Sequence, residues 1–130
     1  MTTVLLDSHV VHWWSAEPDR LSRKAASAVT AADELAVAAI SWWELAWLAT
    51  NGRIVLDLPV RPWLDELSAR VRTAALTPAI ANTAASLARA FPGDPADRLI
   101  YATAIELGWQ VVTKDKRLRA HRYPRTIAVW

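Results

Sequence analysis

Four acidic residues that lie far apart in the sequence each stand near a predicted junction between a strand and a helix. Asp7 and Asp115 follow short apolar runs, and Glu44 and Asp97 lie near the starts of two predicted helices. In an open α/β sheet, ligands bind outside the carboxyl ends of the strands, so these acids can meet at one edge. Carboxylates form an all-oxygen ligand set, which Mg²⁺ and Mn²⁺ prefer. We therefore expect a cation site, because crowded carboxylates repel one another without a cation.

Each acid taken alone also has a purely structural explanation. An Asp at a helix start accepts backbone N–H bonds and offsets the positive end of the helix dipole. The stretch 91–104 shows this clearly, because Pro92 and Gly93 end one helix, Asp94 can cap the next, and Pro95 suits its first position. The alternative function is therefore a non-catalytic α/β binding module whose acids are helix caps. A phosphoacceptor signalling module is the other alternative, although the chain offers it no clear mid-chain acceptor Asp.

The elements that must position these acids alternate between strands and helices. Strands are predicted at 3–6, 35–40, 74–76 (very short), 109–113 and 126–130. One predicted helix follows Asp7, and a second runs from Arg20 to about Ala32 with Asp19 as its cap. A third begins at Ser41 with Glu44 at the capping-box position, and a fourth begins at Arg61-Pro62. A fifth runs from Pro78 to Pro92-Gly93, and the sixth, which Asp94 can cap, ends at Gly108. This alternation predicts a three-layer α/β/α sandwich with a mainly parallel central sheet.

Length and composition set the class of protein. The 130 residues fit a single domain over residues 1–130, with 53% hydrophobic and 22% charged residues, as in a globular chain. Cysteine is absent, which excludes disulfides and thiolate-bound zinc. The first residues carry no basic segment, and Asp7 interrupts the apolar run that follows, so we expect no signal peptide or membrane span and a cytoplasmic protein.

Charge is unevenly distributed along the chain. Residues 114–130 contain six basic residues and one acid, whereas the first 113 residues contain nine basic residues and twelve acids. A basic segment on a mildly acidic body favours a polyanion as partner, because Lys and Arg release counterions from phosphates. A solvated surface explains the same charges equally well.

Four motifs occur in order along nearly the whole chain: V-L-L-D-S-H-V at 4–10, S-W-W-E-L-A at 41–46, G-D-P-A-D-R-L-I-Y-A-T-A at 93–104, and V-V-T-K-D at 111–115. Together they resemble the PIN-domain ribonucleases, specifically the VapC-type toxins of bacterial toxin–antitoxin pairs. The resemblance implies that Asp7, Glu44, Asp97 and Asp115 form a catalytic metal site. It also implies an RNA substrate, a homodimer, and an antitoxin that covers the active edge.

The resemblance also distributes roles within the site. One or two Mg²⁺ or Mn²⁺ ions would be bound directly by Asp7 and Asp97, with Glu44 and Asp115 binding directly or through water. Asp94 is then a cap first and an auxiliary acid second, and Thr113 matches a polar position that often supports the site. The basic residues expected to hold the RNA backbone are Lys114, Lys116, Arg117 and Arg119.

Three groups of conspicuous residues have competing explanations. The chain has eight Trp, and several lie near the motifs: Trp13, Trp14, Trp42, Trp43 and Trp47. For these side chains, packing or an interface is favoured over base stacking. Trp43 and Trp47 form a candidate partner-binding stripe. For His9 and His12 we expect one buried, hydrogen-bonded ring and one exposed ring rather than a metal pair, because no H-E-x-x-H motif is present. For Arg98 we expect a structural ion pair.

Overall fold

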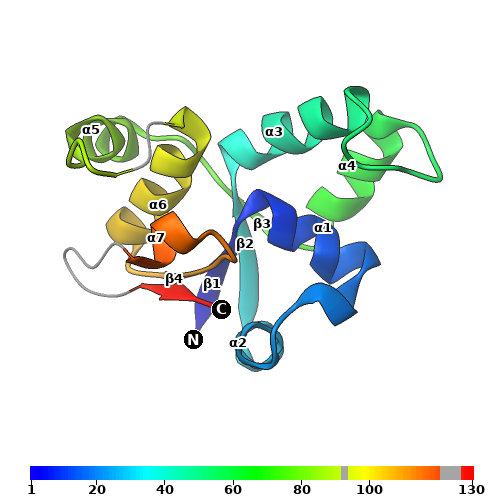
Figure 1. The fold of residues 1–130 in the computed structure, drawn as a ribbon, viewed down its shortest axis with the longest axis horizontal. Helices are drawn as coiled ribbons and strands as arrows, with labels where there is room; N and C mark the ends of the chain where they lie inside the picture. Colours follow the sequence, from blue (N-terminus) through cyan, green and yellow to red (C-terminus); the bar gives the residue numbers. More distant parts are fainter. Residues whose placement is uncertain (92–93, 121–126) are drawn as a thin grey trace.

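The computed structural model describes residues 1–91, 94–120 and 127–130, and its centre is a five-stranded parallel sheet (Figure 1). The strands are β1 (Thr3–Leu6), β2 (Glu34–Ala38), β3 (Arg72–Ala74), β4 (Gln110–Val112) and β5 (Ala128–Val129), in the spatial order β3-β2-β1-β4-β5. Leu6 at the end of β1 lies opposite Val37 of β2 and Val112 of β4. The chain winds away from β1 in one direction through β2 and β3 and then in the other through β4 and β5, so β1 and β4 flank a topological switch point.

Both faces of the sheet are apolar because side chains alternate along each strand. On one face, Val4 and Leu6 of β1 pack with Val37 and Val112. On the other face, Leu5 packs with Ala36, Ala38 and Val111 in a separate cluster. Each face therefore needs its own layer of helices.

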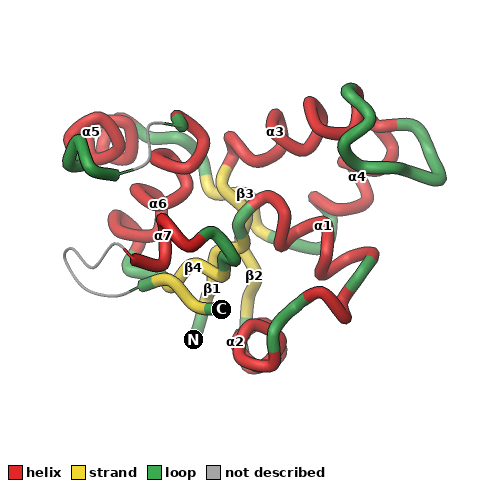
Figure 2. Tube along the Cα trace, in the orientation of Figure 1, coloured by secondary structure: helices red, strands yellow, loops and turns green. Residues whose placement is uncertain are grey.

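The helices supply these layers (Figure 2). Those contributing buried residues to the first cluster are α1 (Ser8–Ala16), α2 (Arg23–Ala31), α3 (Ala39–Thr50) and α4 (Val60–Ser68). Helices α6 (Pro95–Leu107) and α7 (Lys116–Ala120) contribute to the second, and α5 (Pro78–Ser86) packs on α6. A short 3₁₀ helix, η1 (Pro18–Arg20), connects α1 to α2. The predicted three-layer fold with a parallel sheet is confirmed.

Two predicted helix starts are wrong. Ser22, not Asp19, caps α2, and its side chain accepts a hydrogen bond from the Ala25 N–H at 3.0 Å. Asp19 instead lies in η1. Helix α3 begins at Ala39 directly after β2, with no side-chain cap, so Ser41 lies inside the helix and the predicted capping box is absent. The short connection between strand and helix leaves no room for a separate capping turn.

Other boundaries shift by a few residues. Helix α5 ends at Ser86, so Phe91 lies beyond it and packs on Tyr101 of α6 with ring centroids 5.0 Å apart. The predicted end of that helix at Pro92-Gly93 and the predicted strand start at Thr126 lie outside the described residues. Gly108 ends α6 with φ at 70°, as predicted for a helix C-terminus. Within the described residues, no helix combines the length and apolar character needed to cross a membrane.

A candidate acidic site at the carboxyl edge of the sheet

Asp7 lies at the centre of this edge because it directly follows β1. Its side chain is only 7% exposed and accepts hydrogen bonds from the Ser8 N–H at 2.6 Å and the Thr113 hydroxyl at 2.7 Å. Thr113 follows β4, so the parallel pairing of β1 with β4 brings the two residues side by side. The Asp7 N–H donates to the Val112 carbonyl at 3.0 Å, which extends that pairing by one residue. The backbone register thus fixes the carboxylate in a buried position.

Asp94 and Asp97 divide two roles at the start of α6. Asp94 is the N-cap, and its carboxylate accepts from the N–H groups of Ala96 at 2.8 Å and Asp97 at 3.2 Å. Pro95 occupies the first position of the helix, where its missing N–H costs nothing. Because Asp94 caps the helix, the Asp97 side chain in the first turn does not cap it and lines the pocket described below.

Glu44 reaches the same edge from α3, although not from the helix start that the sequence predicts. It lies more than one turn into the helix. Ser41, one turn earlier, is buried and its hydroxyl accepts a hydrogen bond from the Ser8 hydroxyl at 3.0 Å. This contact between α1 and α3 replaces the capping role predicted for Ser41.

Asp115 is bound by a neighbouring arginine. Its carboxylate accepts from the Arg117 N–H at 2.8 Å and lies 3.2 Å from the Arg117 Nη2 atom. The same Nη2 atom is 3.5 Å from Oδ2 of Asp97. The backbone N–H of Asp115 donates to the Thr113 hydroxyl at 3.1 Å. Arg117 therefore joins a carboxylate from the start of α6 to one that follows β4.

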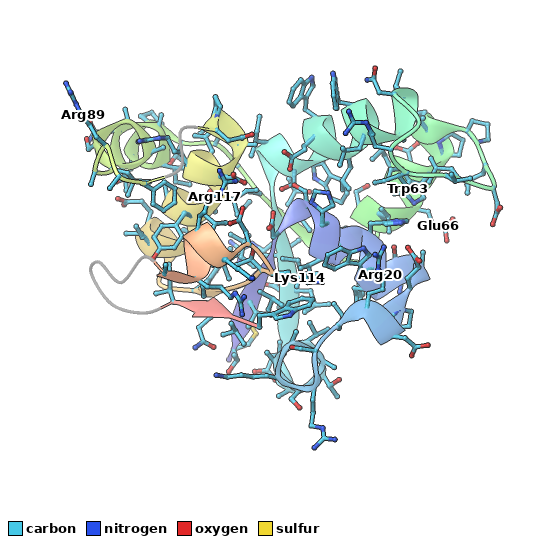
Figure 3. The ribbon with its side chains drawn as sticks, viewed as in Figure 1. Arg20, Trp63, Glu66, Arg89, Lys114 and Arg117 are labelled. Atoms are coloured by element: carbon cyan, nitrogen blue, oxygen red, sulfur yellow. The ribbon has the colours of Figure 1, made fainter. Side chains whose placement is uncertain are left out.

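These residues enclose a pocket of about 560 Å³. We call it the acidic pocket, and its acidic walls are Asp7, Glu44, Asp94, Asp97 and Asp115. The other lining residues are His9, Trp13, Lys114 and Arg117. The pocket lies beside the switch point between β1 and β4, where ligands of open α/β sheets bind. Figure 3 shows Lys114 and Arg117 on this face of the molecule.

The pocket disfavours ionisation of several of its acids. Burial raises the pKa of Asp7, against the effect of its hydrogen bonds from Thr113 and Ser8. Burial also raises the pKa of Glu44, and the charges of Asp7 and Asp94 add to this effect. The pKa of Asp97 rises from 3.8 to about 7, first through burial and then through repulsion by the four other carboxylates. Asp97 is thus an acid whose charge both burial and its neighbours oppose.

Asp115 shows the opposite shift. Burial opposes its ionisation, but the hydrogen bonds from the side chain and backbone of Arg117 outweigh burial and lower the pKa of Asp115. One arginine therefore keeps one of the five acids ionised. Its guanidinium is 64% exposed, so it is held at the mouth of the pocket and not within the core.

The donor set has the chemistry that a hard divalent cation needs. Carboxylates dominate the walls, and their mutual repulsion is expressed in the raised pKa of Asp97. Among the described residues, however, no three Asp, Glu, His or Cys side chains are grouped as the ligands of one ion. Arg117 holds Asp97 and Asp115 in this structure, so a cation that enters the pocket competes with Arg117 for them.

The basic residues predicted to contact a polyanion fall into three groups. Lys114 and Arg117 line the acidic pocket. Lys116 and Arg119 belong to α7 but do not line it, and the Arg119 Nε atom is buried without a hydrogen-bond partner among the described residues. Arg122 and Arg125, which complete the basic segment, lie outside the described residues.

The histidine expectation is met only in part, because His12 is half-buried and its Nδ1 atom has no hydrogen-bond partner among the described residues. His9 is exposed and lines the acidic pocket, whereas the His12 side chain is 13% exposed and lies 3.2 Å from Glu17. His9 and Trp13 are pocket residues that sequence reasoning did not assign to the site. They lie in the first and second turns of α1, directly after Asp7, and this position is the sequence signal that places them there.

Within the described residues, Arg98 does not form the predicted ion pair. Its guanidinium donates to the backbone carbonyls of Ala84 at 3.1 Å, Leu87 at 3.3 Å, Ala88 at 3.2 Å and Phe91 at 3.4 Å. These carbonyls lie at and beyond the end of α5, where a helix leaves acceptors without partners. A guanidinium satisfies several of them at once because its five N–H groups are fixed in a fork.

Most of the Trp side chains named above take part in packing. Trp13, Trp14 and Trp42 pack against the first core cluster. Trp43 and Trp47 on α3 are 60% and 44% exposed, so the predicted stripe is on the surface.

Comparison with known proteins places this geometry in a family. The PIN-domain model matches residues 4–122 of the chain. Ribonuclease VapC22 of Mycobacterium tuberculosis (strain ATCC 25618 / H37Rv) is 66% identical over 130 residues, which are 100% of both proteins.

Solved structures share the fold at much lower identity. VapBC2 from Rickettsia felis bound to a promoter DNA fragment has 14% identity and a TM-score of 0.68, with 98% of this chain and 97% of that chain covered. VapBC-1 from nontypeable Haemophilus influenzae has 18% identity and a TM-score of 0.67, with 88% and 87% covered. These two structures support the fold, while the family model and the M. tuberculosis relative support membership: the chain belongs to the PIN-domain family.

Proposed function

We propose that this chain is a metal-dependent endoribonuclease toxin that cleaves cellular RNA by attack of an activated water on a phosphodiester. The observation that carries the proposal is the convergence of five carboxylates in one pocket, with the pKa of Asp97 raised to about 7. The full-length likeness to a relative named a ribonuclease supports the substrate class. A non-catalytic module does not need carboxylates that repel one another. A phosphoacceptor module lacks its acid, since β3 is followed by Ala75 and Leu76.

Each wall residue has a proposed role. Asp7 and Asp97 bind one or two Mg²⁺ or Mn²⁺ ions directly, and Glu44 and Asp115 bind directly or through water. Asp94 caps α6 and adds negative charge beside Asp97. When bound there, the divalent ion lowers the pKa of a coordinated water and neutralises charge on the departing oxygen.

The remaining site residues orient these acids and the substrate. The Thr113 hydroxyl holds one oxygen of Asp7 through its hydrogen bond, which leaves the carboxylate a single orientation. Lys114 and Arg117 at the pocket mouth attract the RNA backbone, while Lys116 and Arg119 are candidates for contacts farther along it. Phosphate contacts of this kind position the strand without reading its sequence.

The proposal includes protein partners. VapBC-1 and VapBC2 are named as pairs, and a similar structure from Klebsiella pneumoniae is titled a toxin–antitoxin complex. We propose a cognate antitoxin that covers the acidic edge, a homodimer, and a single cytoplasmic domain formed by residues 1–130. The exposed Trp43 and Trp47 are candidate contacts for one of these partners.

The test is cleavage of end-labelled RNA by the purified chain with Mg²⁺, with Mn²⁺ and with EDTA. The expected result is cleavage with either ion, none with EDTA, and none by Asp97→Asn. The matched control is Asp57→Asn, which removes an exposed carboxylate that does not line the acidic pocket. Full activity of Asp97→Asn would overturn the assignment. Sequencing the ends of RNA cleaved in cells would identify the target.

A further inference from the structure

A second hollow of about 570 Å³ lies beside the acidic pocket along α1. His9 and Trp13 line both, so the two hollows adjoin at these side chains. We call the second one the basic hollow, because Arg20 and Arg53 line it and Glu17 is the one acidic residue among the described residues of its wall. The charge along this surface therefore reverses from negative to positive within the width of one indole ring.

Trp13 organises the cations at this boundary. The Arg20 guanidinium carbon lies 5.1 Å from the centroid of its ring, and the Lys114 Nζ atom lies 5.8 Å from it. Cation–π attraction positions a cation without using its N–H donors, which stay available for an anion. Because its ring is in contact with both cations, Trp13 acts as a platform for charges more than as an open surface for a base.

These cations are incompletely neutralised. Arg20 is 57% exposed and its Nη1 atom lies 3.8 Å from Glu17, which His12 also contacts at 3.2 Å. Lys114 and Arg53 form no ion pair within the ranges 1–91, 94–120 and 127–130. In Figure 3, Arg117, Lys114 and Arg20 follow one another from left to right across the view.

We infer that the basic hollow binds the sugar-phosphate backbone of the single-stranded RNA beside the cleaved phosphodiester. The path of the RNA over these cations, which we call the track, begins where the acidic pocket meets the basic hollow. Lys114 holds a phosphate at that boundary, and Arg20 and Arg53 hold phosphates beyond it. The inference rests on the proposed function and extends it from the cleaved bond to the flanking strand. An RNA strand whose cleaved bond lies in the acidic pocket continues beyond that pocket. The basic hollow is the adjoining surface, and its positive charge complements the phosphates of the strand.

An acidic segment of a protein is the other possible occupant, but the geometry favours RNA. An acidic peptide that follows the same path meets the five carboxylates of the acidic pocket and is repelled. RNA enters that pocket only at the phosphodiester that is cleaved, where the divalent ion of the proposed function offsets the repulsion. The track therefore fits RNA, a polyanion in which the cleaved phosphodiester can share the divalent ion with the carboxylates of the acidic pocket.

The test uses the neutral variants Arg20→Gln and Arg53→Gln. Binding of a fluorescent, unstructured RNA of about twelve nucleotides is measured by anisotropy with Mg²⁺ in an Asp97→Asn background, over a range of salt concentrations. The control is Arg89→Gln, which removes the same charge at a site that Figure 3 shows pointing away from the molecule, far from Arg20. Thermal melting of each variant confirms that it is folded.

Each variant should weaken RNA binding by about 3–10-fold at low salt and reduce the slope of log K against log salt by about 0.7, the value for one lost phosphate contact on a single strand. Arg89→Gln should change neither quantity. In the active background, both variants should lower kcat/KM for the long RNA and leave kcat/KM for a dinucleotide unchanged, because a dinucleotide does not reach the basic hollow.

The outcomes separate this track from the proposed function. Unchanged RNA affinity and salt slope in both variants, with Asp97→Asn still inactive, would overturn the track and leave the nuclease proposal standing. The track would also be overturned if the variants lost binding of polyglutamate while binding RNA normally, which would identify an acidic protein as the occupant. Absence of both RNA binding and RNA cleavage in the unmodified chain would overturn both proposals.

Discussion

Replacing Asp97 by Asn should make the metal-free protein more stable while removing its activity. The pKa of Asp97 lies about three units above its ordinary value, at about 7, because burial and four carboxylates oppose its charge. At about 1.4 kcal/mol per unit, the ionised group costs at most ~4 kcal/mol. The side chain is partly open to water, so screening reduces the expected gain to about 1–2 kcal/mol. In a chain of this length that corresponds to a rise in Tm of roughly 4–8 °C.

The gain should depend on pH in a defined direction. Between the unfolded pKa near 3.8 and the folded value near 7, the unfolded state holds fewer protons at Asp97 than the native state. The contribution of Asp97 to the stability of the wild-type protein therefore falls as the pH rises through that window. The full penalty for the ionised carboxylate applies above about pH 7. Asp97→Asn should thus stabilise most at about pH 8 and progressively less toward about pH 4.

The assay is thermal unfolding in EDTA and low salt at both ends of this pH range. Asp57→Asn serves as the control and should change Tm by less than about 2 °C throughout, as expected for a surface substitution. Addition of Mn²⁺ should reverse the order, since ligand binding stabilises only the chain that binds it. A variant less stable than wild type at about pH 8 in EDTA would refute the reasoning, because it would mean that Asp97 contributes a favourable native interaction.

Three further substitutions test single interactions. Thr113→Val removes the hydroxyl that binds Asp7 and should cost about 1–3 kcal/mol in urea unfolding, with Thr113→Ser close to wild type; equal stability of all three would contradict this. Arg117→Ala should tighten Mn²⁺ binding in calorimetry several-fold, because a competing cation is removed, and Arg117→Lys should change it less; weaker binding in Arg117→Ala would count against competition. Arg98→Lys should lose about 1.5–3 kcal/mol in urea unfolding despite keeping its charge, because an ammonium lacks the fork that reaches several carbonyls; wild-type stability would exclude that role.

The parts of the fold that the sequence predicts well are those with local causes. The strand before Asp7 is a short apolar run, and α6 begins with an Asp-Pro pair and ends at a Gly in the left-handed conformation. Each of these signals acts within a few residues, so pattern reading recovers it. The order of the acids along strands and helices then predicts their meeting, because a parallel sheet brings carboxyl ends to one edge.

The features that pattern reading misassigned depend on contacts between remote segments. Ser41 has the right type for a cap, but its hydroxyl contacts Ser8, which is 33 positions away in sequence. Arg98 sits beside Asp97, yet its partners are carbonyls near the end of α5. The local sequence favours the nearest acid as the partner of Arg98, whereas tertiary packing places its guanidinium against backbone carbonyls.

The carboxylates of the acidic pocket differ in how well the protein compensates their negative charge, and this difference gives them different roles. Asp7 has hydrogen bonds from Ser8 and Thr113, and Asp94 has the free N–H groups of α6. Asp115 has Arg117, which reaches Asp97 only at 3.5 Å. Asp97 therefore has weaker compensation from the protein than Asp7, Asp94 or Asp115, and an added cation would offset the repulsion that raises its pKa. In the proposed function Asp97 binds the metal, so activity would require the same charge that the metal-free fold disfavours.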